Sequence, residues 1–146
     1  MDMIGNTPLV RLGENLFAKA EFVNLTGSVK DRAAVSILDD AEKRGMLQPG
    51  GTVIEPTSGN MGISLAALCA FRGYNAIIVM PDSMSRERQL LMRAYGAQVV
   101  LTPGSLGMAG AVEKARQLAS QIPGSYVPGQ FENPAKIGRA SCRERV

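Results

Sequence analysis

The chain has 146 residues, of which 45% are hydrophobic and 20% are charged, a composition typical of one globular domain. It contains neither the ~20 consecutive apolar residues of a membrane span nor a secretory signal, so we expect a cytoplasmic protein with no membrane partner. Two cysteines and no histidine argue against a metal site and histidine-activated nucleophiles, and an aromatic content of 5% argues against nucleic-acid binding.

Two short strand-like segments come first, at residues 8–12 and 16–22. They precede the alternation of strands and helices that fills the rest of the chain. We therefore expect these two segments to belong to a different sheet from the strands that follow them.

A helix is predicted to begin at Val29, because apolar residues recur from there with helical spacing, and Gly45 is placed to end it. Ser28 is the expected N-cap, and Asp31 would complete a shortened capping box. Lys30 would then be the second helical residue, where the positive end of the helix dipole opposes its charge.

The position of Lys30 has two explanations. In the first, Lys30 is a solvated surface residue, because a positive charge at the N-terminal end of an exposed helix costs only ~0.3–1 kcal/mol. Alternatively, surroundings that disfavour the ammonium lower its pKa and favour the neutral amine, which is the form that attacks a carbonyl carbon. The helix pattern alone does not decide between the two.

Strands and helices alternate through the remainder of the chain. The predicted strands are 52–55, 75–81, 98–101 and 125–127, and the predicted helices are 60–72, 85–95 and 108–122. The continuous apolar run NAIIVMP at 75–81 is typical of a strand buried in a parallel sheet. This alternation predicts an α/β fold, a twisted parallel sheet with helices on both faces.

The loop after strand 52–55 reads PTSGNMG and combines small residues, two hydroxyls and an amide with the start of a helix. Free backbone N–H groups at a helix start form a site for a phosphate or a carboxylate. Capping of the helix by Thr57 or Ser58 would explain part of this composition. The spacings of a P-loop and of a dinucleotide-binding glycine motif are both absent.

The last ten residues, 137–146 (IGRASCRERV), have no helical or alternating pattern. They resemble the translation of a sequencing adapter, so we expect a non-native tail that packs against nothing. The alternative is a natural basic tail. Without this segment Cys69 is the one remaining cysteine, and its apolar helix favours a packing role.

Six segments together resemble the N-terminal half of the cysteine synthases (O-acetylserine sulfhydrylases), pyridoxal-phosphate enzymes of fold type II. They are IGNTPLV (4–10), NLTGSVKDR (24–32), EPTSGNMGI (55–63), MPDSMSRER (80–88), YGAQVVLT (95–102) and QFENP (130–134). The resemblance extends over residues 3–136. It favours the chemical explanation of Lys30.

The resemblance implies a role for particular residues. Lys30 would bind pyridoxal 5′-phosphate through its amine and later transfer a proton, and Asn60 would contact the ring oxygen of the cofactor. The substrate carboxylate would be bound by Thr57, Ser58, Gly59, Asn60, Met61 and Gln130. Met61 stands where the family usually has threonine, which removes one hydroxyl from this group and bears on the choice of substrate.

The resemblance also implies a domain arrangement. Residues 1–23 would belong to a large domain, most of which is missing, and residues 24–136 would form the small α/β domain. The phosphate-binding loop and the residue facing the pyridine nitrogen would lie in the missing half. We therefore expect a truncated chain that is inactive alone, from an enzyme that is a homodimer at full length.

The implied reaction is the β-replacement that makes cysteine from O-acetylserine and sulfide. A cystathionine β-synthase and a serine/threonine dehydratase are the alternatives within the same enzyme group. An alternative of another class is a non-catalytic module that binds the C-terminal tail of serine acetyltransferase. A plain nucleotide-binding α/β domain is disfavoured by the missing motifs.

Overall fold

The computed structural model describes residues 3–130 and 132–136, so the tail predicted at 137–146 lies outside the described residues. The helices are α1 (Lys30–Lys43), α2 (Asn60–Arg72), α3 (Arg86–Ala94) and α4 (Gly107–Gln121), with short 3-10 helices η1 (Glu21–Val23), η2 (Gly104–Leu106) and η3 (Pro134–Lys136). The strands are β1 (Leu9–Arg11), β2 (Phe17–Lys19), β3 (Thr52–Pro56), β4 (Asn75–Pro81) and β5 (Gln98–Thr102).

The central sheet is parallel, with the strand order β3-β4-β5. The strand predicted at 125–127 is reduced to a single bridge, in which Tyr126 lies parallel to Val53 beside β3. Two backbone hydrogen bonds make this bridge, from Ile54 N–H to Tyr126 O (2.9 Å) and from Tyr126 N–H to Thr52 O (2.8 Å). The chain therefore returns to the free edge of β3 at this point.

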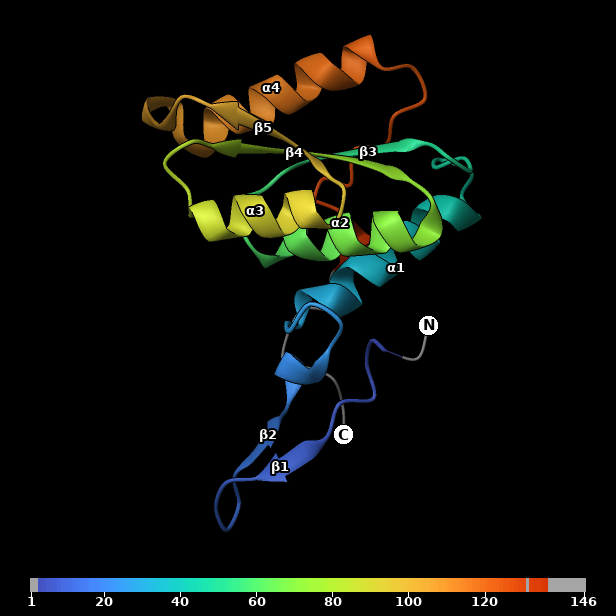
Figure 1. Cartoon of the computed structure of the whole chain (residues 1–146). Helices are drawn as coiled ribbons and strands as arrows, with labels where there is room; N and C mark the ends of the chain where they lie inside the picture. The colour runs from blue at the N-terminus through green and yellow to red at the C-terminus, as the bar shows by residue number, and fades with distance from the viewer. Residues whose placement is uncertain (1–2, 131, 137–146) are drawn as a thin grey trace.

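Helices cover both faces of the sheet, as predicted. Helix α4 lies on one face, while α2 and α3 lie on the other and α1 packs against α2 (Figure 1). Strand β4 is buried on both sides, because successive side chains point to opposite faces. Ile77 and Val79 pack in the cluster under α4, and Ile78 packs in the larger cluster under α2.

Strands β1 and β2 form a separate antiparallel hairpin, in which Leu9 is opposite Lys19. The hairpin extends away from the α/β body, beyond the first turn of α1 (Figure 1). Its apolar side chains are exposed, with 47% of Leu9 and 53% of Phe17 accessible to solvent. The expected separation of these strands from the main sheet is thus observed.

The hairpin is connected to α1 by a polar network. The Glu21 carboxylate accepts hydrogen bonds from the Arg32 guanidinium (2.8 Å) and the Thr7 hydroxyl (2.8 Å). These bonds, led by that of Arg32, lower the pKa of Glu21 from 4.5 to about 2.

Across the described residues, no helix is both long enough and apolar enough to cross a bilayer.

Candidate functional site

A pocket of about 180 Å³ lies at the carboxyl end of the parallel strands. Parallel α/β sheets bind ligands at this edge, where strands end and helices begin. The lining residues are Lys30, Thr57, Ser58, Gly59, Asn60, Met61, Met108 and Gln130. The structure thus brings every candidate residue of the sequence analysis to one pocket and adds Met108, from the first turn of α4.

Lys30 is the first residue of α1, one position earlier in the helix than the sequence predicted. The N-cap residue is Val29 and not the predicted Ser28, although the Ser28 hydroxyl accepts a hydrogen bond from the Lys30 backbone N–H at 3.0 Å. The predicted capping box is wrong, because the Asp31 carboxylate accepts the N–H of Thr26 (2.6 Å) instead of that of Ser28. The Lys30 ammonium has no ion pair within the described part of the chain.

The loop that leads into α2 forms a further wall of the pocket. Gly59 precedes the helix in an extended conformation, and no side chain caps the first N–H groups of α2. The capping proposed for Thr57 or Ser58 is therefore not observed. The Gly62 N–H donates to the Gly59 carbonyl oxygen at 3.0 Å, whereas the N–H groups of Asn60 and Met61 remain available to an anion. Arg88 of α3 donates a hydrogen bond to the Ser58 carbonyl oxygen at 3.2 Å, which connects the loop to α3.

The loop residues differ in how they face the pocket. Asn60 is exposed, whereas the side chain of Thr57 is buried and that of Met61, 2% exposed, belongs to the hydrophobic core. Met61 therefore offers the pocket an apolar wall and a backbone N–H group, and no side-chain donor.

Gln130 is held by a buried carboxylate that the sequence analysis missed. Glu55, in β3 and 1% exposed, accepts hydrogen bonds from the N–H groups of Gly129 (3.1 Å) and Gln130 (3.4 Å). Such bonds offset the free-energy cost of burying a carboxylate. A signal was available, since Glu55 is the one charged residue of β3 and stands directly before the loop that contains Thr57.

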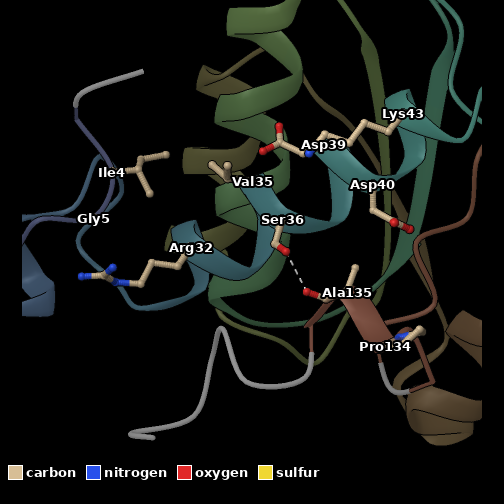
Figure 2. Close-up of a pocket in the computed structure, with 10 residues that line it drawn as sticks. All are labelled: Ile4, Gly5, Arg32, Val35, Ser36, Asp39, Asp40, Lys43, Pro134 and Ala135. Atoms are coloured by element: carbon tan, nitrogen blue, oxygen red, sulfur yellow. Dashed lines mark hydrogen bonds between the residues drawn. The ribbon is translucent and has the colours of Figure 1, made fainter. Parts of the chain in front are cut away.

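A larger cavity of about 500 Å³ lies along another face of α1 and contains none of the predicted site residues. Figure 2 shows Asp39, Asp40 and Lys43 along its helical wall, with Ser36 donating a hydrogen bond to the Ala135 carbonyl oxygen at 2.8 Å. The smaller pocket is the better candidate, because it combines an amine, an amide and an uncapped helix start at the sheet edge.

Comparison with known proteins gives the family. Residues 1–141 match the model of the family described as "Pyridoxal-phosphate dependent enzyme". The chain belongs to this family. The assignment confirms the resemblance drawn from the sequence motifs, and pyridoxal phosphate is the cofactor on which the family depends.

Among curated proteins, the chain is 57% identical over 141 residues to a probable cysteine synthase of Bacillus subtilis (strain 168), covering 92% of this chain and 45% of the relative. The crystal structure of an O-ureido-L-serine synthase superimposes with a TM-score of 0.86 at 48% identity, covering 92% of this chain and 44% of that one. An O-acetylserine dependent cystathionine beta-synthase from Helicobacter pylori superimposes with a TM-score of 0.85 at 41% identity, covering 92% and 47%. The chain thus spans about half the length of these relatives.

Proposed function

We propose that this chain supplies the lysine and the substrate-carboxylate site of a pyridoxal-phosphate-dependent enzyme that makes cysteine from O-acetylserine and sulfide. The observation that carries the proposal is the pocket in which Lys30 lies with the Thr57–Met61 loop and Gln130. The cysteine synthase relative supports the reaction class.

The residues of the pocket fit the reactive part of the cofactor. Lys30 contributes an amine without an ion-pair partner in the described region, and Asn60 contributes an exposed amide. An amine is the group that binds an aldehyde covalently, and an amide can bond the ring oxygen. When bound, pyridoxal phosphate withdraws electrons from the substrate Cα, which allows a group on Cβ to leave.

The protein groups then have separate tasks. The uncapped N–H groups at the start of α2, with the Thr57 and Ser58 hydroxyls, bind the substrate carboxylate. Gln130, whose backbone N–H is bonded to Glu55, supports the same carboxylate. The Lys30 amine takes the proton from the substrate Cα and returns it later, which is the role of a general base.

The proposed domain division follows from the two sheets. Residues 1–23, which contain the hairpin β1–β2, would join a large domain contributed by further chain, and residues 24–136 would be the small domain. The exposed apolar side chains of the hairpin support this division, because large apolar patches on a surface mark contacts with other protein. The same further chain would bind the cofactor phosphate, and the full-length protein would be a homodimer.

The proposal is tested in a completed protein, in which residues 1–136 are joined to the C-terminal half of the Bacillus subtilis relative. Lys30→Ala should abolish the absorbance of the bound cofactor and the formation of cysteine together. Lys43→Ala, a matched control at the exposed far end of α1, should preserve both. An unaltered spectrum with full activity in Lys30→Ala would make Lys30 a surface lysine.

A second reaction is favoured by the similarity to the Helicobacter pylori structure, which is that of an O-acetylserine dependent cystathionine beta-synthase. The completed protein should therefore be given O-acetylserine or serine with sulfide and, separately, with homocysteine. Cysteine formed in excess supports the first proposal, cystathionine in excess supports the second, and a 2-oxo acid would indicate a dehydratase.

The 146-residue chain alone should make no cysteine, because it lacks the expected phosphate-binding loop. Product detection at saturating O-acetylserine and sulfide checks this.

A titration of the chain with the C-terminal peptide of a serine acetyltransferase tests the non-catalytic alternative, in which the chain binds that partner and has no catalytic role.

A further inference from the structure

Asp31 directly follows Lys30, and its carboxylate is completely buried. Its Oδ2 accepts the backbone N–H of Thr26 at 2.6 Å, and its Oδ1 accepts the Thr26 hydroxyl. Oδ1 is also 2.6 Å from the Ser64 hydroxyl of α2. One carboxylate therefore connects the loop before α1, the first turn of α1 and the neighbouring helix.

The Ser64 hydroxyl has one proton and three possible acceptors, of which the Thr26 hydroxyl oxygen is the farthest at 3.3 Å. Asp31 Oδ1 is 2.6 Å away and the carbonyl oxygen of Asn60 is 2.9 Å away. The shorter contact involves a charged acceptor, and hydrogen bonds to charged groups are about twice as strong as those between neutral groups. The proton is therefore assigned to the bond with Asp31.

The ends of this hydrogen bond lie close to the two walls of the pocket. Asp31 is one residue from Lys30, and Ser64 is one helical turn from Asn60. Packing of apolar side chains between α1 and α2 would allow the helices to slide past each other, whereas a hydrogen bond to a buried carboxylate fixes one relative position.

We infer that Asp31 is a positioning residue, which holds the Lys30 end of α1 against the Asn60 end of α2 through Ser64. A buried carboxylate is a costly way to join two helices, since apolar residues of similar volume often stabilise a fold as well or better. Here the buried carboxylate serves to fix the distance between the two pocket walls that carry Lys30 and Asn60. This inference rests on the proposed function for its catalytic meaning, and on geometry alone for its structural content.

Native-state hydrogen exchange of the 146-residue chain tests the geometry without any cofactor. Ser64→Ala removes one donor, and Asp31→Asn replaces one acceptor oxygen by a donor. In both variants, exchange should accelerate on the order of tenfold at Thr26, Lys30 and Gly62, since one charged hydrogen bond accounts for about that factor.

The matched control is Ser36→Ala, which removes from the same helix a hydroxyl that bonds the Ala135 carbonyl oxygen. It should leave exchange at the pocket ends of α1 and α2 unchanged. Uniform acceleration over the whole chain in Ser64→Ala, or no change at Thr26 and Lys30, would overturn the positioning role.

The catalytic meaning is read in the completed protein. Ser64→Ala should lower kcat on the order of tenfold and alter the absorbance of the Lys30-bound cofactor, because small displacements of reacting groups reduce rates strongly. Full kcat with an unaltered spectrum would overturn the inference. Failure of the proposed function is distinguishable, since the parent protein would then make no cysteine while the exchange results stood.

Discussion

Gly62 lies in the third position of α2, inside the loop that forms one wall of the pocket. A Cβ added there would lie 2.8 Å from both Thr57 Cγ2 and Met92 Cε, and 3.2 Å from Ile78 Cγ2. Gly59, three residues earlier, has no atom within 4 Å of the corresponding position. The same substitution by alanine is therefore expected to destabilise the chain at Gly62 and to have little effect at Gly59.

The magnitude follows from which neighbours can move. Met92 Cε is the end of a flexible side chain, but Thr57 is β-branched, stiff at χ1 and 4% exposed. Insertion of a methyl group into such packing costs ~1–3 kcal/mol, and the higher helix propensity of alanine returns at most ~1 kcal/mol. We expect Gly62→Ala to reduce the free energy of unfolding by ~1–2 kcal/mol, and Gly59→Ala to change it by less than ~0.5 kcal/mol.

Urea unfolding of the 146-residue chain measures both values. With a slope of ~1–3 kcal/mol per molar urea, the expected loss lowers the midpoint of Gly62→Ala by roughly 0.3–2 M with no change in slope. In the completed protein, displacement of Thr57 should also raise the KM for O-acetylserine. If Gly62→Ala is as stable as the parent chain, or if Gly59→Ala loses as much, the packing argument is wrong.

Three further predictions concern titratable groups. Because its folded pKa is about 2 and its ordinary value 4.5, Glu21 adds stability above pH 4.5 that is lost as the pH falls through 2. Glu21→Gln should lower the free energy of unfolding by ~1–2 kcal/mol at neutral pH, after allowance for solvent screening, and flatten its acid dependence in urea titrations. Burial raises the pKa of the Cys69 thiol to about 12, so iodoacetamide at mildly alkaline pH should label it only after unfolding, as peptide mass spectrometry would show. Glu55→Gln should accelerate amide exchange at Gln130 while leaving exchange at Lys30 unchanged; equal acceleration at both would contradict a local role for Glu55.

The fold was predictable from the sequence because its signals are local. The apolar run of β4 and the helical spacing of α2 gave these elements with the observed bounds, and the helical spacing of α1 gave a start one residue too early. The last strand was overpredicted, since its pairing with β3 extends over one residue, Tyr126, which depends on where the chain returns in space. Local pattern does not contain that information.

The sequence by itself determined most of the elements, the α/β class and, with the family resemblance, every pocket residue except Met108, because short motifs such as those around Lys30 and Thr57 carry their own chemistry. Only the tertiary structure decided what Asp31 and Glu55 bind. The sequence analysis assigned Asp31 to a local capping box and gave Glu55 no role. In the structure Asp31 binds Ser64 and Glu55 binds Gln130, and both partners are far away in the sequence. A buried charge must find donors wherever the fold supplies them, so its role is set by packing between elements and not by its neighbours along the chain.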